Sequence, residues 1–322
     1  MTNLPLTGAW HEAVISVRDL DKWCAALTHL FGWSEVSRGS VDARLLRSWH
    51  LASGITVEER VLGNTDDNAR QVRLIKFNGA EQVQIRSSAM GWDTGGVFSL
   101  LCYARDTDTT FRAAQELGWS AYNDPVDMHF EGRTLRNVVL RAWDGVNFGL
   151  YCPKTPPPPS PPRYAKASAP FNGQQMVRAI KPARDFYANV LGWTPWFEGT
   201  LRLNCNNFGM PENYVGVLPK NVAIAAGGKD AANAWAYAQV ELVQWDGFSG
   251  RDLAARAVPP NLGILALRIP VADARAHAHS IIQRGGQLWS TPTTIALAPY
   301  GESIIFSVRT PDGVMIEFFS LT

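Results

Sequence analysis

The sequence predicts an α+β protein made of four βαβββ modules, arranged in two lobes with open, curved, antiparallel-rich sheets. Three observations lead to this prediction. The two halves of the chain resemble each other, each half repeats one order of strand and helix patterns, and a proline-rich segment separates the halves. The chain has 322 residues, which suggests two domains at roughly 100–200 residues per domain.

The proline-rich segment is expected to be a stiff spacer, because proline fixes φ and removes the amide donor. It covers residues 153–165 and leaves a first lobe at 1–152 and a second lobe at 166–322. Each lobe is expected to hold two βαβββ modules, at about 10–90, 95–152, 170–248 and 260–322.

Short motifs recur at corresponding places in the two halves. LTHLFGW at 27–33 matches YANVLGW at 187–193, each at the end of a helical pattern. DGVNFGLYCP at 144–153 closes the first half, and DGVMIEFFSL at 312–321 closes the second. Matches in the same order at corresponding places favour a true internal repeat.

The first module begins with a predicted strand at 12–18 and a helix after it. Apolar residues at i, i+3, i+7 and i+10 share one face of this helix, and Gly32 provides its stop. These apolar residues are Leu20, Trp23, Leu27 and Leu30. Strand-like runs follow around 43–50, 55–62, 70–77 and 81–87.

The same order repeats in the later modules. In the second module, a strand at 97–106 precedes a helix at 107–119, with Thr107 or Asp108 as N-cap and Gly118 as stop. Strands at 133–151 then meet at the Asp144-Gly145 turn. In the second half, ILALRIPVAD leads into the helical pattern ARAHAHSIIQRGG, and strands run on to the C-terminus.

Composition excludes several classes of protein. Thirty Lys and Arg against 29 Asp and Glu give a net charge of +1, whereas nucleic-acid binders need a basic surplus. No apolar run approaches the roughly 18–20 residues of a membrane span. The N-terminus lacks the pattern of a secretory signal, so a cytoplasmic protein is expected. The four scattered cysteines favour reduced thiols over a disulfide framework.

The module order, together with RDFYANVLGW at 184–193 and TPDGVMIEFF at 310–319, resembles the vicinal oxygen chelate superfamily. This superfamily includes glyoxalases, bleomycin-resistance proteins and extradiol dioxygenases. The resemblance covers nearly the whole chain outside the spacer. It implies that modules pair into curved sheets whose concave face holds the substrate. Metal ligands, where present, would project from the first and last strand of each module.

The resemblance assigns specific residues to these ligand places. They are His11 and Gln84 in the first module, positions near Phe98 and Gly149 in the second, a position near Phe171 and Glu241 in the third, and Ile264 or Leu265 and Glu317 in the fourth.

The sequence leaves the pairing of the modules open. Pairing within each half would join His11 to Gln84, and Glu241 to Glu317 as a carboxylate acid–base pair. Pairing one with four and two with three would gather His11, Gln84 and Glu317 around a divalent metal (Zn, Ni, Fe or Mn) and leave Glu241 alone. Neither arrangement supplies the two histidines and one glutamate of an extradiol iron site.

The candidate residues differ in their surroundings. Glu317 shares a strand face with Met315 and Phe319, so its carboxylate must be paired or line a cavity. His129 lies in a predicted loop and is a candidate general base. Glu241 either faces solvent or contacts the substrate. Aromatic residues suited to bind a planar ligand are Tyr103, Tyr151 and Trp92.

The favoured function is an enzyme of the lyase or isomerase type that acts on a small, apolar, aromatic molecule. Glu317 or His11 would remove a proton, and an enolate-like or phenolate-like anion would be stabilised by a metal or by hydrogen-bond donors. The alternative is a non-catalytic binding or resistance protein of the same fold, and the third is an extradiol dioxygenase. The expected partner is a small molecule, with no nucleic acid or membrane, and a homodimer fits the sequence.

Overall fold

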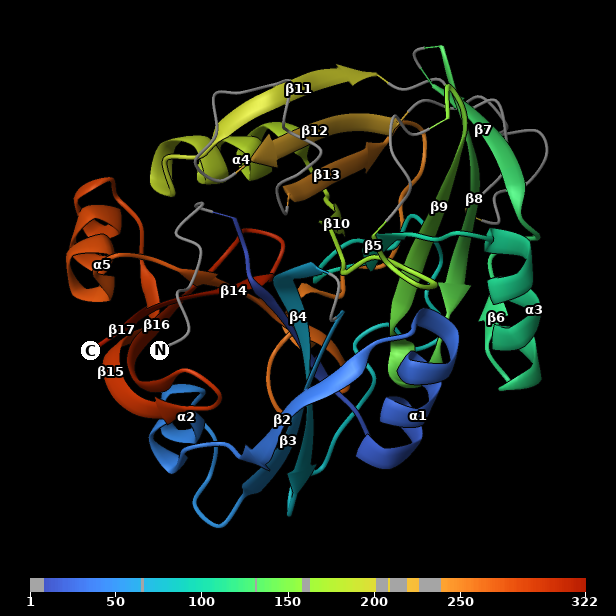
Figure 1. The fold of residues 1–322 in the computed structure, drawn as a ribbon. Helices are drawn as coiled ribbons and strands as arrows, with labels where there is room; N and C mark the ends of the chain where they lie inside the picture. Colours follow the sequence, from blue (N-terminus) through green and yellow to red (C-terminus); the bar gives the residue numbers. More distant parts are fainter. Residues whose placement is uncertain are drawn as a thin grey trace.

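A computed structural model describes residues 9–64, 67–130, 132–157, 163–200, 208, 219–225 and 239–322. Within these residues, the strands form two curled sheets with helices packed against them (Figure 1). The predicted α+β class with four modules in two curled sheets is therefore confirmed. In the described part of the chain, no helix is long and apolar enough to cross a membrane.

Each module contributes one set of strands with a helix after its first strand. The first has β1 (Glu12–Ser16), α1 (Leu20–Phe31), β2 (Ser34–Ser40), α2 (Ala43–Ser48), β3 (Thr56–Asn64) and β4 (Asp67–Asn78). The second has β5 (Ser99–Tyr103), α3 (Thr107–Glu116), β6 (Ser120–Ala121), β7 (Val126–Phe130), β8 (Arg133–Arg141) and β9 (Asn147–Thr155). The third has β10 (Asn172–Met176), α4 (Ile180–Asp185), β11 (Thr194–Thr200), β12 (Pro219–Ala225) and β13 (Gln239–Trp245). The fourth has β14 (Gly263–Pro270), α5 (Ala274–Gln283), β15 (Leu288–Leu297), β16 (Gly301–Arg309) and β17 (Met315–Leu321).

The modules pair across the two halves of the chain. One sheet runs β15-β16-β17-β14-β1-β4-β3-β2 and joins the fourth module to the first. The other runs β11-β12-β13-β10-β5-β9-β8-β6, with β7 on β8, and joins the third module to the second. In Figure 1, red β14–β17 accordingly continue into blue β1–β4. The sheets thus do not divide the chain at the proline-rich segment, and the pairing is one with four and two with three.

The repeated Asp-Gly motifs hold consecutive modules together. Asp144 Oδ2 accepts hydrogen bonds from the Arg18 amide at 3.1 Å and from the Trp23 indole at 2.9 Å. At the equivalent turn, Asp312 Oδ1 accepts a bond from the Arg178 amide at 3.0 Å. Arg18 and Arg178 both follow the first strand of a module. The second module is therefore fastened to the first, and the fourth to the third, by the same contact.

Three hydrophobic clusters make up the core. The largest lies between the sheets and helices α1, α3, α4 and α5 and includes Trp23, Trp33, Trp119 and Trp193. The second covers the opposite face of the eight-stranded sheet, where Leu45 and Trp49 of the α2 region pack. The third covers the opposite face of the nine-stranded sheet. The faces that carry the second and third clusters are called the inner faces below.

The run at 43–50 is a helix, so the prediction of a strand there is wrong. Asp42 caps α2 by accepting a bond from the Arg44 amide at 2.8 Å. Leu45, Leu46 and Trp49 then turn toward the sheet and are buried. A short capped turn with one apolar face is favoured because tertiary packing overrides weak strand propensity.

The run at 81–87 is not a strand either. It forms only an isolated bridge between Gln84 and Leu262, and the last strand of the first module is β4.

Strand β2 was not predicted, because it is mostly exposed and lacks apolar alternation. Gly32 ends α1 in the left-handed conformation at φ 74°, as predicted. The N-cap of α3 is Asp106 rather than Thr107 or Asp108.

The turn contacts lead to a stability prediction. Replacing Asp144 with alanine leaves the buried Trp23 indole and the Arg18 amide without an acceptor. We expect the free energy of unfolding to fall by about 1–3 kcal/mol in urea titrations. Asp124→Ala, on an exposed loop, is the control and should change it by less than about 0.5 kcal/mol. Equal stabilities of the two variants would contradict the fastening role.

Candidate functional site

The inner face of the eight-stranded sheet carries a network of buried charges. Arg73 of β4 contacts Glu12 of β1 at 2.8 Å and Glu59 of β3 at 2.7 Å. Arg268 of β14 contacts Glu12 at 3.0 Å and Glu317 of β17 at 2.7 Å. The side chains of all five residues are between 0 and 5% exposed. Each charge is therefore paired inside the protein.

Neutral donors complete this network. The Trp49 indole donates to Glu317 Oε1 at 2.7 Å, and the Tyr300 hydroxyl donates to Glu12 Oε1 at 2.6 Å. Burial alone would raise the pKa of Glu12, but the positive charges of Arg73 and Arg268 outweigh burial and hold it at about 2. Burial and the Glu12 carboxylate raise the pKa of Tyr300. The network is closed to solvent by α2 and by Tyr300.

This network lies on the strands that would carry the metal ligands according to the resemblance. The inner-face residues there are Glu12, Arg73, Arg268 and Glu317. Guanidinium groups are permanently protonated and cannot ligate a cation, and here their charge occupies the space between the carboxylates. These residues do not fit a divalent metal. Across the ranges that the structure describes, no group of three or more His, Cys, Asp or Glu could hold a metal ion.

The structure does not gather His11, Gln84 and Glu317 as three ligands. His11 directly precedes β1, and its buried ring lies edge-on to Tyr300 with 5.7 Å between ring centres. The β1 residue that enters the network is its neighbour Glu12. Gln84 lies beyond β4, where it lines a hollow beside the second module. Glu317 is on the inner face, as its alternation with Met315 and Phe319 predicts.

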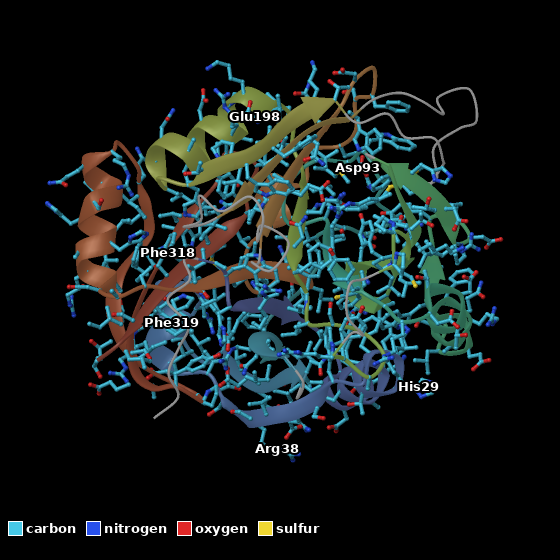
Figure 2. All side chains as sticks on the ribbon, turned by 45° about the horizontal axis from the view of Figure 1, so that its top comes forward. His29, Arg38, Asp93, Glu198, Phe318 and Phe319 are labelled. Atoms are coloured by element: carbon cyan, nitrogen blue, oxygen red, sulfur yellow. The ribbon has the colours of Figure 1, made fainter. Side chains whose placement is uncertain are left out.

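Phe318 and Phe319, labelled in Figure 2, are consecutive residues of β17 that belong to opposite faces of the sheet. Phe318 belongs to the largest cluster, on the helix side of the sheet, and Phe319 belongs to the second cluster, on the inner face. The same argument, applied to Glu12 in EAVIS and Arg268 in GILALRIP, would have pointed to the network. A charge within an apolar strand must find a partner across the sheet, and these residues carry that signal.

His129 does not occupy either inner face. It is exposed on the edge strand β7, and its Nδ1 lies 2.9 Å from the Thr134 hydroxyl in the β7–β8 hairpin. Nothing in this position brings the imidazole near the inner-face carboxylates, so the hypothesis of a general base at His129 finds no support in the geometry.

The inner face of the nine-stranded sheet carries a hydrogen-bonded chain that ends at Glu241. Glu241, Gln174 and Ser99 are paired across β13, β10 and β5. The Ser99 hydroxyl donates to Gln174 Oε1 at 3.1 Å, and the Gln174 amide bonds to the Glu241 carboxylate. Asn172 donates to Glu241 Oε2 at 3.1 Å, and Asn221 donates to Oε1. Both carboxylate oxygens are thus held in fixed positions.

Glu241 differs from the other buried glutamates in having no cation beside it. Among the described residues it forms no ion pair, and burial raises its pKa despite the bonds from Asn221, Gln174 and Asn172. The residue as a whole is nevertheless only partly buried. The Oδ1 atoms of Asn172 and Asn221 are buried without a hydrogen-bond partner. This arrangement suits proton exchange and recognition of a polar group.

Aromatic residues border this chain along the strands. Tyr103 of β5 stacks on Phe171 with ring centres 4.4 Å apart, and Tyr151 of β9 lies 6.2 Å from Phe171. Burial raises the pKa of Tyr103 to about 12, so its hydroxyl stays protonated. Trp92 packs on Phe248 at 5.2 Å beside the third cluster. The other aromatic residues of this cluster are Phe98, Phe208, Trp245 and Tyr122.

Comparisons with known proteins bear on the fold. No protein-family model and no curated protein matches the sequence. Glyoxalase I from Zea mays has a TM-score of 0.62 at 15% identity, over 97% of this chain and 92% of that chain. A putative dioxygenase from Bacillus subtilis has a TM-score of 0.58 at 11% identity, over 98% and 85%. The chain therefore has the fold of the vicinal oxygen chelate superfamily, and the resemblance is confirmed at that level.

Breaking the buried network should destabilise the protein strongly. In Arg268→Met, Glu12 and Glu317 lose a shared cation while remaining buried. We expect the free energy of unfolding to fall by about 3–5 kcal/mol in denaturant titrations. Arg184→Met, which breaks a half-exposed pair, should cost no more than about 1 kcal/mol. A cost for Arg268→Met as small as the control's would contradict the structural role.

The network also predicts how stability depends on pH. The pKa of Glu12 is about 2 in the folded protein and near its ordinary value of 4.5 in the unfolded chain. The folded state is thus favoured above about pH 4.5, and this contribution is lost as pH falls toward 2. Unfolding titrations between pH 6 and pH 2 should show this decline. A constant unfolding free energy across that range would contradict the predicted pairing.

Proposed function

We propose that this protein is an enzyme of the lyase or isomerase type, in which Glu241 transfers a proton to and from a small, apolar, aromatic molecule. The observation that supports this most directly is the environment of Glu241. Its carboxyl group has a raised pKa and no cationic partner among the described residues, and the residue as a whole is only partly buried. A carboxyl group whose pKa is raised is better suited to both accept and return a proton.

Neighbouring side chains position this carboxyl group. Gln174 accepts from Ser99 with its oxygen, which orients its NH₂ group toward Glu241. Asn172 and Asn221 hold the two carboxylate oxygens. Ser99 and Gln174 are positioning residues, because they act on substrate through the orientation of Glu241.

The same amides account for anion stabilisation. In the proposed step, a substrate C–H or O–H bond breaks, its proton moves to a Glu241 oxygen, and the electron pair stays on the substrate as an enolate-like or phenolate-like anion. Glu241 becomes neutral at that moment, so the Asn172 and Asn221 N–H groups that held its charge can donate to the new anion. Return of the proton to another atom completes an isomerisation, and loss of a leaving group completes an elimination.

The surroundings of Glu241 support the proposed substrate class. Tyr103, Tyr151 and Phe171 lie beyond the polar chain in one direction along the strands, and the third cluster lies in the other. Aromatic side chains favour a planar, apolar body with few polar groups.

The proposed chemistry relies on protein groups alone. Ser99, Gln174 and Glu241 offer one hydroxyl, one amide and one carboxylate, a weak donor set for zinc or for the transition metals that favour imidazole. We therefore assign no step to a metal.

Proton transfer can be tested without knowing the product. Incubation with aryl methyl ketones in D₂O should exchange their α-protons, measured by proton NMR. We expect Glu241→Gln to lower the exchange rate by about 100-fold or more, because the amide cannot accept the proton. Glu198→Gln, on the outer strand β11 (Figure 2), removes a comparable charge and should retain the rate. Equal exchange rates in the Glu241→Gln variant and the parent would refute the proposal.

The pH profile provides a second readout of the same proposal. The base must be ionised, and the pKa of Glu241 is raised above 4.5. The exchange rate should therefore still be rising with pH above about 4.5 and then reach a plateau. A profile already flat from pH 4 upward would contradict Glu241 as the base.

A non-catalytic binding protein remains the second candidate. The buried, unpartnered oxygens of Asn172 and Asn221 favour it, because they offer recognition of a ligand donor without chemistry. If the protein is a binder, Glu241→Gln should leave the affinity for an aromatic ligand unchanged, and neither the parent nor the variant should exchange α-protons. If it is an enzyme, the variant should retain the affinity and lose the proton exchange that the parent shows.

A further inference from the structure

A small hollow lies at the second-module end of the nine-stranded sheet. It has a volume of about 210 Å³ and is bounded by the segment after β4, by β6 and β8, and by the Asp144-Gly145 turn. Its lining includes Gln84, Arg86, Tyr122, Arg141, Trp143 and Asn147. We call it the arginine hollow, because two arginine residues line it. All of its lining residues belong to the first half of the chain.

Arg86 brings an unneutralised charge to this hollow. Its side chain is buried, with Nη1 bonded to the Gly95 carbonyl at 2.9 Å and Nη2 to the Asp93 carbonyl at 2.7 Å. Its Nε is buried without a partner. The Asp93 carboxylate (Figure 2) is held by Arg251 at 2.8 Å. Burial lowers the pKa of Arg86 to about 10, so it is still charged at neutral pH.

Arg141 brings a second positive charge. It ends β8, and its guanidinium carbon lies 4.8 Å from the centre of the Tyr122 ring. Neither Arg86 nor Arg141 forms an ion pair within the described residues. The acidic residue in the lining, Asp144, already accepts bonds from the Arg18 amide and the Trp23 indole. The hollow therefore has a surplus of positive charge.

We infer that the arginine hollow is a binding site for a small oxyanion, namely the carboxylate or phosphate group of a small molecule. A buried guanidinium without a counterion is costly, and an incoming anion would offset that cost. Planar guanidinium groups match the geometry of both carboxylate and phosphate. The volume suits one such group with a small organic body, which Tyr122 and Trp143 could contact.

This site is separate from the chemistry proposed at Glu241. The lining of the hollow shares no residue with the hydrogen-bond partners of Glu241, and the strand order β13-β10-β5-β9-β8 places four strand spacings between Glu241 and Arg141, or roughly 19 Å across the sheet at about 4.8 Å per spacing. The inference therefore stands even if the proton-transfer proposal fails.

Calorimetric titration of the full chain with inorganic phosphate and with benzoate tests the inference. We expect at least one of the two anions to bind, and Arg141→Ala to weaken that binding by about tenfold or more. Arg47→Ala removes an exposed guanidinium from α2 and should change the affinity by less than about twofold. Arg141→Lys keeps the charge without the planar fork and should fall between these values.

The phosphate and benzoate titrations distinguish the two possible sources of the oxyanion. Binding of phosphate alone assigns the site to phosphate groups, and binding of benzoate alone assigns it to carboxylates. Glu241→Gln should bind like the parent protein, which separates this result from the test of proton transfer. Absence of binding by both anions would overturn the inference. Equal weakening by Arg47→Ala and Arg141→Ala would also overturn it, because the attraction would then be nonspecific.

Discussion

Arg268 makes the contact on which the rest of the arrangement depends. Its guanidinium binds Glu12 from the first module and Glu317 from the fourth, although these residues are far apart in the chain. Each buried charge needs a partner, since an unpaired one lowers the free energy of unfolding by several kcal/mol. This requirement favours β1 beside β14 over pairing within the halves. The second and third modules are then left to pair with each other, which places Glu241 beside Gln174 and Ser99.

The two inner faces use corresponding strands in opposite ways. In the eight-stranded sheet, two arginines neutralise the carboxylates, and α2 with Trp49 closes the face. In the nine-stranded sheet, Glu241 is bonded to neutral amides and a part of it stays exposed. A carboxylate held by arginines has a lowered pKa and is a poor base, whereas one held by amides can exchange a proton. Duplication thus allows one sheet to serve stability while the other is available for chemistry.

Local patterns predicted local structure well and long-range partners poorly. The face of α1, its stop at Gly32 and the Asp-Gly repeats follow from spacing and turn chemistry, which act over a few residues. The prediction of a strand at 43–50 is wrong because the conformation of this run depends on the sheet that Leu45 and Trp49 contact. Gln84 was assigned to a last strand at 81–87, whereas β4 is the last strand of the first module, and His11 was assigned to the place that its neighbour Glu12 takes on β1. The pairing of the first module with the fourth depends on residues 256 positions apart, such as Glu12 and Arg268, which no local pattern specifies.

Glu241 could be identified as a candidate from sequence, but its chemistry could not, because its environment comes from other strands. Alternation fixes only the face on which it lies, while burial among the neighbouring strands raises its pKa against the lowering effect of the bonds from Asn221, Gln174 and Asn172. Arg141 on the same sheet does not cancel this effect. It lies four strand spacings from Glu241, and at roughly 19 Å across the sheet and an effective dielectric constant of about 20, two unit charges interact by less than about 1 kcal/mol. Strand order therefore keeps the Arg141 cation away from the carboxyl group, so that Glu241 can retain a raised pKa on a sheet that also carries this positive charge.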